Sequence, residues 1–220
     1  MYKYLFFFIL FIPFNAFCQG AGEQGESYSK EEVESPQTGK ATFWSDSKVD
    51  FSIIFDPFNK PVHGGGLLVK WKKRWFKTKH FEGYTGLAVQ YYYDEETDKL
   101  STWVKGYNHD LSGYLVSEWI YYPFRACGVF LGIEPFAGIT NLRSDGRLRF
   151  DRFNLYEEFT NTYTFFNYGV SQSVGYQLNN VHLSIFALAS LKGYLDSGRT
   201  RPTDQDAKIF LGANVSLAIE

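Results

Sequence analysis

The sequence predicts an all-β protein: an antiparallel up-and-down transmembrane β-barrel of about eight strands, with short periplasmic turns and longer extracellular loops. Three observations predict this fold. An apolar stripe at period two runs through the last segment, 208–219, as in a strand with one lipid-facing side. The chain also begins with a stretch typical of an export signal. Aromatic residues make up 20% of the chain although its mean hydropathy is −0.26, so apolar surface is delivered in alternating strands rather than in long helices.

Residues 1–18 are interpreted as a signal peptide. The segment has a basic residue at Lys3 and an apolar run, 5–12, which is too short for a membrane helix. Cleavage is expected ahead of Gln19. Lipidation of Cys18 is the alternative, but the bulky Phe17 before it fits that processing poorly, so ordinary cleavage is preferred. Cleavage leaves Cys127 as the single cysteine, which excludes an intramolecular disulfide.

Two further segments follow the signal. Residues 19–46 are rich in Gly, Glu, Ser and Gln and are expected to form a flexible acidic periplasmic lead-in. Residues 47–220 are expected to form the barrel. The formal net charge of −2 and the lack of a basic tract give no reason to propose nucleic acid as a partner.

From Lys48 onward, apolar alternation recurs in runs about as long as the 9–11 residues of a tilted spanning strand. The expected strands are 48–55, 65–73, 81–93, 110–122, 128–140, 163–178, 181–192 and 208–219. The register of 110–122 stays open, because bulky residues occupy both of its faces. Segments 94–109 and 141–162 are expected to be polar outer loops, although 100–104 could extend a strand above the membrane. Asn179 and Asn180 are expected to form a two-residue hairpin that tolerates positive φ at both positions.

Charged residues also occur at inward-facing positions of these strands. The interior of an eight-stranded barrel is just filled by side chains, so a packed network is expected rather than a pore. Buried charges persist when they are paired, which favours structural ion pairs over a conduction path or an acid and base pair. The expected lumen charge network comprises Asp50, Lys70, Lys72, Glu82, Glu134, Lys192 and Lys208.

The histidines offer the only candidates for catalysis. His182 shares a strand face with Ser184, and such a pair suggests acyl transfer, but no third group is apparent and a polar lumen position is preferred. His109, beside Asp110 and Ser112 in a predicted outer loop, is the better candidate, although adjacency in sequence is not catalytic geometry. His63 lies in another outer loop and His80 in a basic turn. No metal-ligand spacing occurs, and no catalytic, cofactor or metal site is predicted.

Signal, lead-in, alternating strands and the C-terminal pattern Gly212, Val215, Leu217 resemble the small outer membrane β-barrel proteins of Bacteroidota, PorT-like proteins with an outer membrane protein β-barrel domain. Gln19 at the proposed cut fits the exported proteins of that lineage. The resemblance covers 48–220. It implies residence in the cell outer membrane, contact with outer-membrane lipid, and recognition by the barrel-assembly machinery during insertion. The implied assembly signal is Gly212, Val215, Leu217 and Ile219, although the chain ends in Glu220 rather than in an aromatic residue.

The leading hypothesis is therefore a monomeric, non-enzymatic outer-membrane barrel with a structural, surface-contact or secretion and assembly-support role. Any surface or periplasmic protein partner stays open. One alternative is a lipid A-modifying outer-membrane enzyme, a deacylase or acyltransferase, and another is a transporter of small apolar ligands. A soluble periplasmic barrel is the rival fold, and its apolar stripe would face inward.

Overall fold

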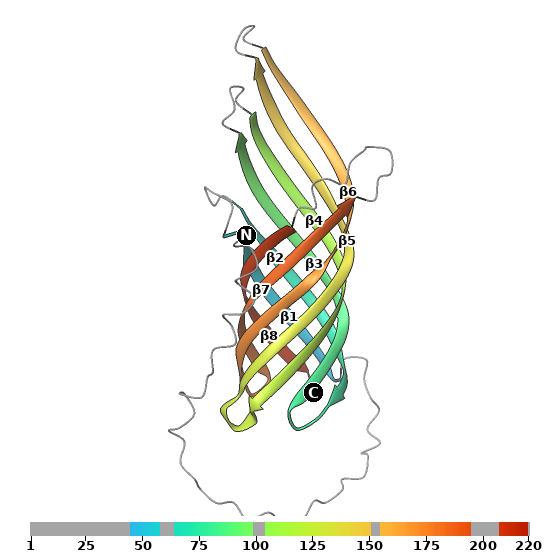
Figure 1. Cartoon of the computed structure of the whole chain (residues 1–220), viewed down its shortest axis with the longest axis vertical. Coiled ribbons are helices and arrows are strands. Elements are labelled where there is room, and N and C mark those ends of the chain that lie inside the picture. The colour runs from blue at the N-terminus through green and yellow to red at the C-terminus, as the bar shows by residue number, and fades with distance from the viewer. Residues whose placement is uncertain (1–44, 58–63, 99–103, 151–154, 195–206, 220) are drawn as a thin grey trace, which may run out of the picture. The chain divides into compact units, whose positions relative to one another are not determined.

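The computed structural model describes residues 45–57, 64–98, 104–150, 155–194 and 207–219. Eight antiparallel strands close into a barrel in the order β1 to β8 (Figure 1), which confirms the predicted fold class. The strands are β1 Ser47–Phe55, β2 Gly65–Lys77, β3 Phe81–Asp98, β4 Val104–Phe124, β5 Val129–Phe150, β6 Leu155–Leu178, β7 Val181–Tyr194 and β8 Ala207–Ile219. A 3-10 turn, η4 Arg125–Cys127, joins β4 to β5. Within the described ranges, no helix has the length and apolar character needed to cross a membrane. The predicted signal peptide and nearly all of the lead-in lie outside these ranges.

The barrel closes where the first strand meets the last. β1 pairs with β2 on one side and with β8 on the other, so that Ser47 lies opposite Ile219 and Phe55 opposite Leu211. Side chains then alternate between lumen and exterior along every strand. Leu115 is 66% exposed on the exterior, whereas its neighbour Val116 is buried. The apolar stripe therefore faces outward, opposite to the pattern of a soluble barrel.

The structure fixes the register of β4, which the sequence left open. Leu115, Trp119 and Tyr121 face outward. The residues between them face the lumen and are buried: Tyr114, Val116, Glu118, Ile120 and Tyr122. Both faces are bulky because the lumen is itself apolar above and below the level of Glu118.

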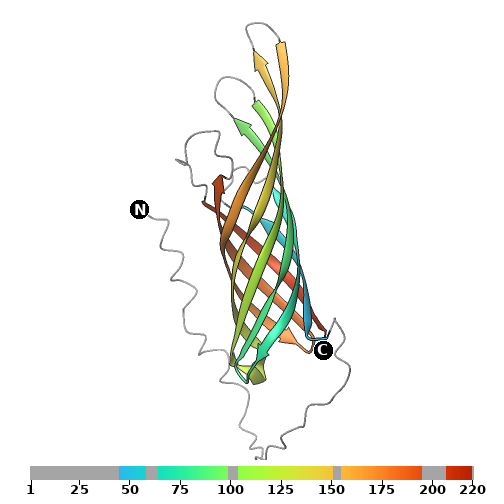
Figure 2. The same ribbon diagram turned by 90° about the vertical axis from the view of Figure 1, so that its right-hand side faces the viewer.

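The two predicted loops 94–109 and 141–162 are wrong over most of their length. β3 continues to Asp98 and β4 begins at Val104, while β5 continues to Phe150 and β6 begins at Leu155. Beyond the apolar band neither face needs to be apolar, so hydropathy stops alternating although the backbone pairing continues. These four strands form one sheet that extends past the ends of the other four (Figures 1 and 2). We call residues 94–98, 104–109, 141–150 and 155–164 the projecting sheet.

The short turns all lie at the other end of the barrel. They are 78–80, 125–128 and the hairpin of Asn179 and Asn180 between β6 and β7. That hairpin was predicted, but positive φ occurs only at Asn179, at 52°. A turn of the II′ type requires positive φ only at its first central residue, so Asn180 does not need it.

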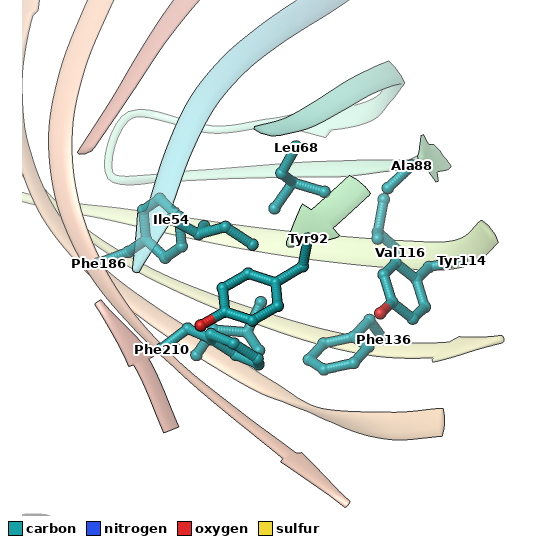
Figure 3. Packing of buried hydrophobic residues seen from close by; sticks show 10 residues of the cluster. Ile54, Leu68, Ala88, Tyr92, Tyr114, Val116, Phe136, Phe186 and Phe210 are labelled. Atoms are coloured by element: carbon teal, nitrogen blue, oxygen red, sulfur yellow. The ribbon is translucent and has the colours of Figure 1, made fainter. Parts of the chain in front are cut away.

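The lumen is filled in layers, which are easiest to follow along β4. Tyr114 and Val116 belong to an apolar cluster in the half of the barrel toward the projecting sheet (Figure 3). Ile120 and Tyr122 belong to a second cluster near the short turns, with Tyr84 and Phe130. Glu118 lies between the two clusters, at the level where the buried charges gather.

Candidate functional site

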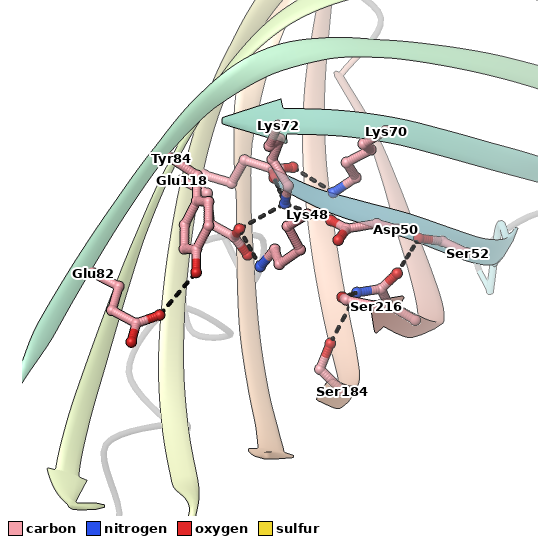
Figure 4. A network of polar contacts seen from close by, with 12 residues as sticks. Lys48, Asp50, Ser52, Lys70, Lys72, Glu82, Tyr84, Glu118, Ser184 and Ser216 are labelled. Carbon is pink, nitrogen blue, oxygen red and sulfur yellow. Dashed lines mark hydrogen bonds and ion pairs between the residues drawn. The ribbon is translucent and has the colours of Figure 1, made fainter. Parts of the chain in front are cut away.

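Six buried charged side chains from four strands meet in the middle of the lumen (Figure 4). Alternation brings them inward two residues apart on β1 and β2, and β4 and β5 supply one carboxylate each. They are Lys48, Asp50, Lys70, Lys72, Glu118 and Glu134, which we call the lumen ion network. Three ammonium groups balance three carboxylates, so the network is formally neutral.

Lys72 lies at the centre of the network and is fully buried. Its Nζ contacts the Asp50 carboxylate and lies 2.6 Å from Glu118 Oε2 and 3.0 Å from Glu134 Oε2. Lys48 Nζ lies 2.5 Å from Glu118 Oε2, and Lys70 Nζ 2.5 Å from Glu134 Oε1. Every member therefore has an oppositely charged partner, which is the condition under which buried charges are tolerated.

The three carboxylates of the network have the spacing of a cation site. Donor oxygens of Asp50, Glu118 and Glu134 all lie within 4.8 Å of one another. The ammonium of Lys72 contacts all three of these side chains. A cation that belongs to the chain thus lies where a metal ion would be held.

Beside the lumen ion network, hydrogen-bonded polar side chains fill the lumen at the same height along the barrel. Ser52 Oγ donates to Asn214 Oδ1 at 2.9 Å, and Asn214 Nδ2 donates to Ser216 Oγ at 2.8 Å. Between Asn214 and the network lies a void of about 10 Å³, lined also by Ser171 and Ser184. A void of this size has room for about one water molecule and no larger ligand.

A second polar cluster lies nearer the projecting sheet. Ser112 Oγ and Thr140 Oγ1 share a hydrogen bond of 2.7 Å. Asn167 Nδ2 donates to Thr140 Oγ1 and to Tyr114 Oη, both at 3.0 Å, and Ser190 Oγ donates to Asn167 Oδ1 at 2.5 Å. Hydrogen bonds therefore tie β4, β5, β6 and β7 together across the lumen above the charges.

The residues of the predicted lumen charge network do not all lie together in the structure. Asp50, Lys70, Lys72 and Glu134 lie together. Glu82 is buried nearer the short turns, where its carboxylate accepts hydrogen bonds from Tyr84 Oη at 2.9 Å and Arg125 Nη2 at 3.3 Å.

The other two predicted lysines lie toward the opposite end of the barrel. Lys208 Nζ lies 5.9 Å from the ring centroid of Tyr92. Lys192 pairs with Asn167 along the backbone, and its side chain lies outside the described part of the chain.

Two members of the network were missed in the sequence. Lys48 shares the inward face of β1 with Asp50, so alternation alone was sufficient to find it. Glu118 required the register of β4, which no sequence pattern fixed.

Neither His109 nor His182 lies with the side chains that a catalytic group would need. His109 faces outward and its Nδ1 lies 2.8 Å from Tyr91 Oη, whereas Asp110 and Ser112 are buried on the opposite face of the same strand. His182 is buried against Phe130, with ring centroids 5.5 Å apart, and its Nδ1 has no hydrogen-bond partner among the described residues.

The remaining residues named for Ser–His chemistry and for the turns are placed as follows. Ser184 lies 3.5 Å from Asn214 Nδ2, from which it accepts a hydrogen bond. His80 Nδ1 lies 3.1 Å from the carbonyl oxygen of Tyr122 in a short turn. His63 lies outside the described residues.

The proposed assembly signal lies on β8. Val215, Leu217 and Ile219 are exposed on the outer face, and Gly212 is buried between its partners Ile54 and Phe186. The apolar stripe on the outer face of β8 is the feature that the resemblance assigns to such a signal. Its recognition by an assembly machinery stays a prediction.

Fold and site together define a class: a closed eight-stranded antiparallel barrel with an apolar exterior and a packed, ion-paired lumen.

No protein-family model and no curated protein matches the chain. Three solved structures show what it is similar to. Neisserial surface protein A is 14% identical, over 79% of this chain and 94% of that one, with a TM-score of 0.34. The N-terminal β-barrel domain of Pseudomonas aeruginosa OprF is 13% identical, over 79% and 97%, with a TM-score of 0.40. A major outer membrane protein of Thermus thermophilus is 16% identical, over 78% and 98%, with a TM-score of 0.40. Structural similarities at these identities and TM-scores assign no function to the chain.

Proposed function

We propose that this chain is an integral outer-membrane barrel that neither catalyses a reaction nor conducts ions, and that holds the projecting sheet at the cell surface for contact with other molecules. One observation carries the proposal. β3, β4, β5 and β6 continue past the barrel as one paired sheet, while the lumen from which they rise is filled and ion-paired.

The exterior supports a membrane span. Its middle is aliphatic, as at Ile53, Leu67 and Ile185, which are each at least 60% exposed. Exposing such side chains to water is unfavourable by about 1.5–3 kcal/mol each, and lipid removes that cost. Aromatic pairs flank the band at both ends: Phe81 with Tyr121, at 4.8 Å between centroids, and Tyr93 with Tyr107, at 6.1 Å. Aromatic girdles of this kind mark the two interfaces of membrane barrels.

The lumen supports a closed barrel. Apolar clusters lie on both sides of the ion network, and the void beside it has a volume of about 10 Å³. An aqueous path would have to separate Lys72 from its carboxylates, and breaking one partner out of a buried ion pair costs about 3–5 kcal/mol. A transporter of apolar ligands needs a cavity larger than the void of about 10 Å³ beside the ion network.

The projecting sheet is held by contacts of its own. Arg147 Nη2 lies 2.8 Å from Glu158 Oε1 across β5 and β6, and Thr160 Oγ1 donates to Asp145 Oδ1 at 2.7 Å. Such cross-strand pairs stabilise a sheet without a core. Among the described strands, β6 pairs with β5 alone over 155–164. These features suit a surface-contact role.

Cysteine labelling of intact cells tests the proposal. In a Cys127→Ser background, Thr160→Cys in the projecting sheet reacts with a membrane-impermeant maleimide on intact cells. Lys79→Cys in a short turn reacts only after the outer membrane is permeabilised. The background protein without either new cysteine is the control. Labelling of Lys79→Cys on intact cells would contradict the orientation, and steady current steps in planar bilayers would contradict the closed lumen.

A further inference from the structure

A polar side chain, that of Gln172 on β6, lies on the outer wall of the barrel within the apolar band. Gln172 faces outward, because its neighbours Ser171 and Ser173 line the void inside the lumen. The next outward residues along the strand are Val170 and Val174. The Gln172 amide therefore lies among apolar side chains on the side of the wall that faces lipid in a membrane barrel.

Gln172 lies at the middle of the expected membrane span. Two outward tyrosines of the same strand, Tyr168 and Tyr176, lie four residues to either side and are 41% and 49% exposed. A tilted strand rises by about 2.5 Å per residue along the membrane normal, so each tyrosine is about 10 Å from Gln172 in height. Aromatic girdles bound an apolar band about 25 Å tall. Gln172 therefore faces the centre of the hydrocarbon.

The barrel itself does not satisfy this amide. The side chain of Gln172 is half-buried and makes no hydrogen bond within the part of the chain that the structure describes. Its cross-strand neighbours are the apolar Ile133 on β5 and Ala187 on β7. Hydrocarbon offers neither a donor nor an acceptor, so a polar group that faces it is unfavourable unless another molecule pairs with it.

A second polar interruption lies in the same wall, between β4 and β5. Pairing of these two strands stops where Pro135 lies opposite Ser117. Proline has no amide hydrogen, so Pro135 cannot donate to the Ser117 carbonyl oxygen. Pro135 is two residues from Ile133, the cross-strand neighbour of Gln172. This side of the barrel thus combines an unpaired side-chain amide with a gap in the backbone ladder.

Small side chains beside Gln172 make this part of the wall shallow. Ala187 and Ala189 on β7 and Ala137 on β5 occupy outward positions and are half-buried. We call the outward residues Ala137, Val170, Gln172, Ala187 and Ala189 the Gln172 wall. Small residues at membrane interfaces let two protein surfaces approach until their polar side chains meet. The Gln172 wall has this composition around one polar group.

We propose that two copies of this chain dimerise in the membrane through the Gln172 wall, with the two Gln172 amides hydrogen-bonded to each other across a twofold axis. This inference rests on the proposed function, which embeds the barrel in a membrane. A side-chain amide carries both a donor and an acceptor, so two identical amides related by a twofold axis satisfy each other with two hydrogen bonds. A second copy is therefore the partner whose chemistry matches this face.

Sedimentation equilibrium of the purified chain in a density-matched detergent tests the inference. We expect wild type to dimerise, and Gln172→Met, which keeps the length of the side chain without its amide, to raise the dissociation constant about 30-fold, the effect of two hydrogen bonds in a membrane environment. Ala187→Phe keeps the amide but holds the two walls apart, and it is expected to weaken the dimer as well.

The matched control is Val69→Met on the opposite side of the barrel. Its strand, β2, lies four strands from β6 in the ring. Val69 lies at the height of Gln172, because Lys70 beside it and Ser171 beside Gln172 line the same void. Val69 is exposed on the apolar outer face, so its replacement changes a lipid-facing side chain outside the Gln172 wall. The control is expected to keep the wild-type dissociation constant.

The outcomes separate this inference from the proposed function. Each variant is first shown to be folded by its faster migration in unboiled electrophoresis. A wild-type chain that inserts into vesicles but stays monomeric overturns the inference and leaves the proposed function standing. Dimerisation of Gln172→Met as tight as that of wild type, or an equal loss in Val69→Met, also overturns the inference. A wild-type chain that does not insert into vesicles overturns both.

Discussion

Replacing Lys72 by Met is the sharpest perturbation of the lumen ion network. The change removes the ammonium that contacts Asp50, Glu118 and Glu134 and leaves a side chain of similar length. Lys48 and Lys70 then face three carboxylates, so one negative charge is buried without compensation. Removing one partner from a buried ion pair costs about 3–5 kcal/mol, and we expect the free energy of unfolding to fall by that amount.

The assay is urea unfolding of the barrel refolded into phospholipid vesicles, followed by tryptophan fluorescence and by unboiled electrophoresis. A second variant, Lys72→Met with Asp50→Asn, restores neutrality and is expected to recover most of the loss. Lys79→Met in an exposed turn is the control and is expected to stay within about 0.5 kcal/mol of wild type. The reasoning is refuted if Lys72→Met unfolds at the same urea concentration as the control, or if the double variant is no more stable than Lys72→Met.

Three further predictions concern the strand packing, the projecting sheet and the cation site. In Gly138→Ala, the new methyl group would collide with the Gly113 carbonyl oxygen, and we expect the free energy of unfolding to fall by about 1–3 kcal/mol. Gly113→Ala is the control, because a Cβ atom at Gly113 has no other atom within 4 Å, and its urea unfolding is expected to stay unchanged. The hydrogen bond from Thr160 holds the pKa of Asp145 below its usual value, so this carboxylate stabilises the sheet above its unfolded pKa and stops doing so as pH falls through its folded pKa. Thr160→Val should therefore raise the pKa of Asp145 in a carbon-13 NMR titration, and an unchanged pKa would contradict that cause. Lys72→Ala leaves three carboxylate donors around an open centre, so Ca²⁺ should raise the melting temperature of this variant and not of wild type, and an equal response of both would rule out a site there.

The strands with an apolar outer face and small or polar groups on the inner face were predictable from the sequence. On β1, Phe51 and Ile53 alternate with Asp50 and Ser52, and the structure keeps that division. The hairpin at Asn179 was predictable because only two residues separate two alternating runs. In both cases one local rule decides the outcome.

The register of β4 and the place of Glu118 depend on side chains that other strands contribute to the lumen. β4 places Tyr114 and Ile120 inside, and apolar clusters from other strands make bulky inward residues acceptable at those levels. The membership of Glu118 in the ion network follows only once that register is known. The projecting sheet leaves no hydropathy signal, because β6 is exposed on both faces there, as at Glu157 and Glu158, and is held by cross-strand pairs such as Arg147 with Glu158.

The central claim is a closed barrel embedded in the outer membrane, and fractionation of the native host followed by electrophoresis of boiled and unboiled samples tests it most directly. We predict that the chain is recovered in the outer-membrane fraction and that it migrates faster unboiled than boiled, as a closed detergent-resistant barrel does. Recovery in the soluble periplasm, with the same mobility before and after boiling, would contradict the lipid-facing exterior and the surface function derived from it.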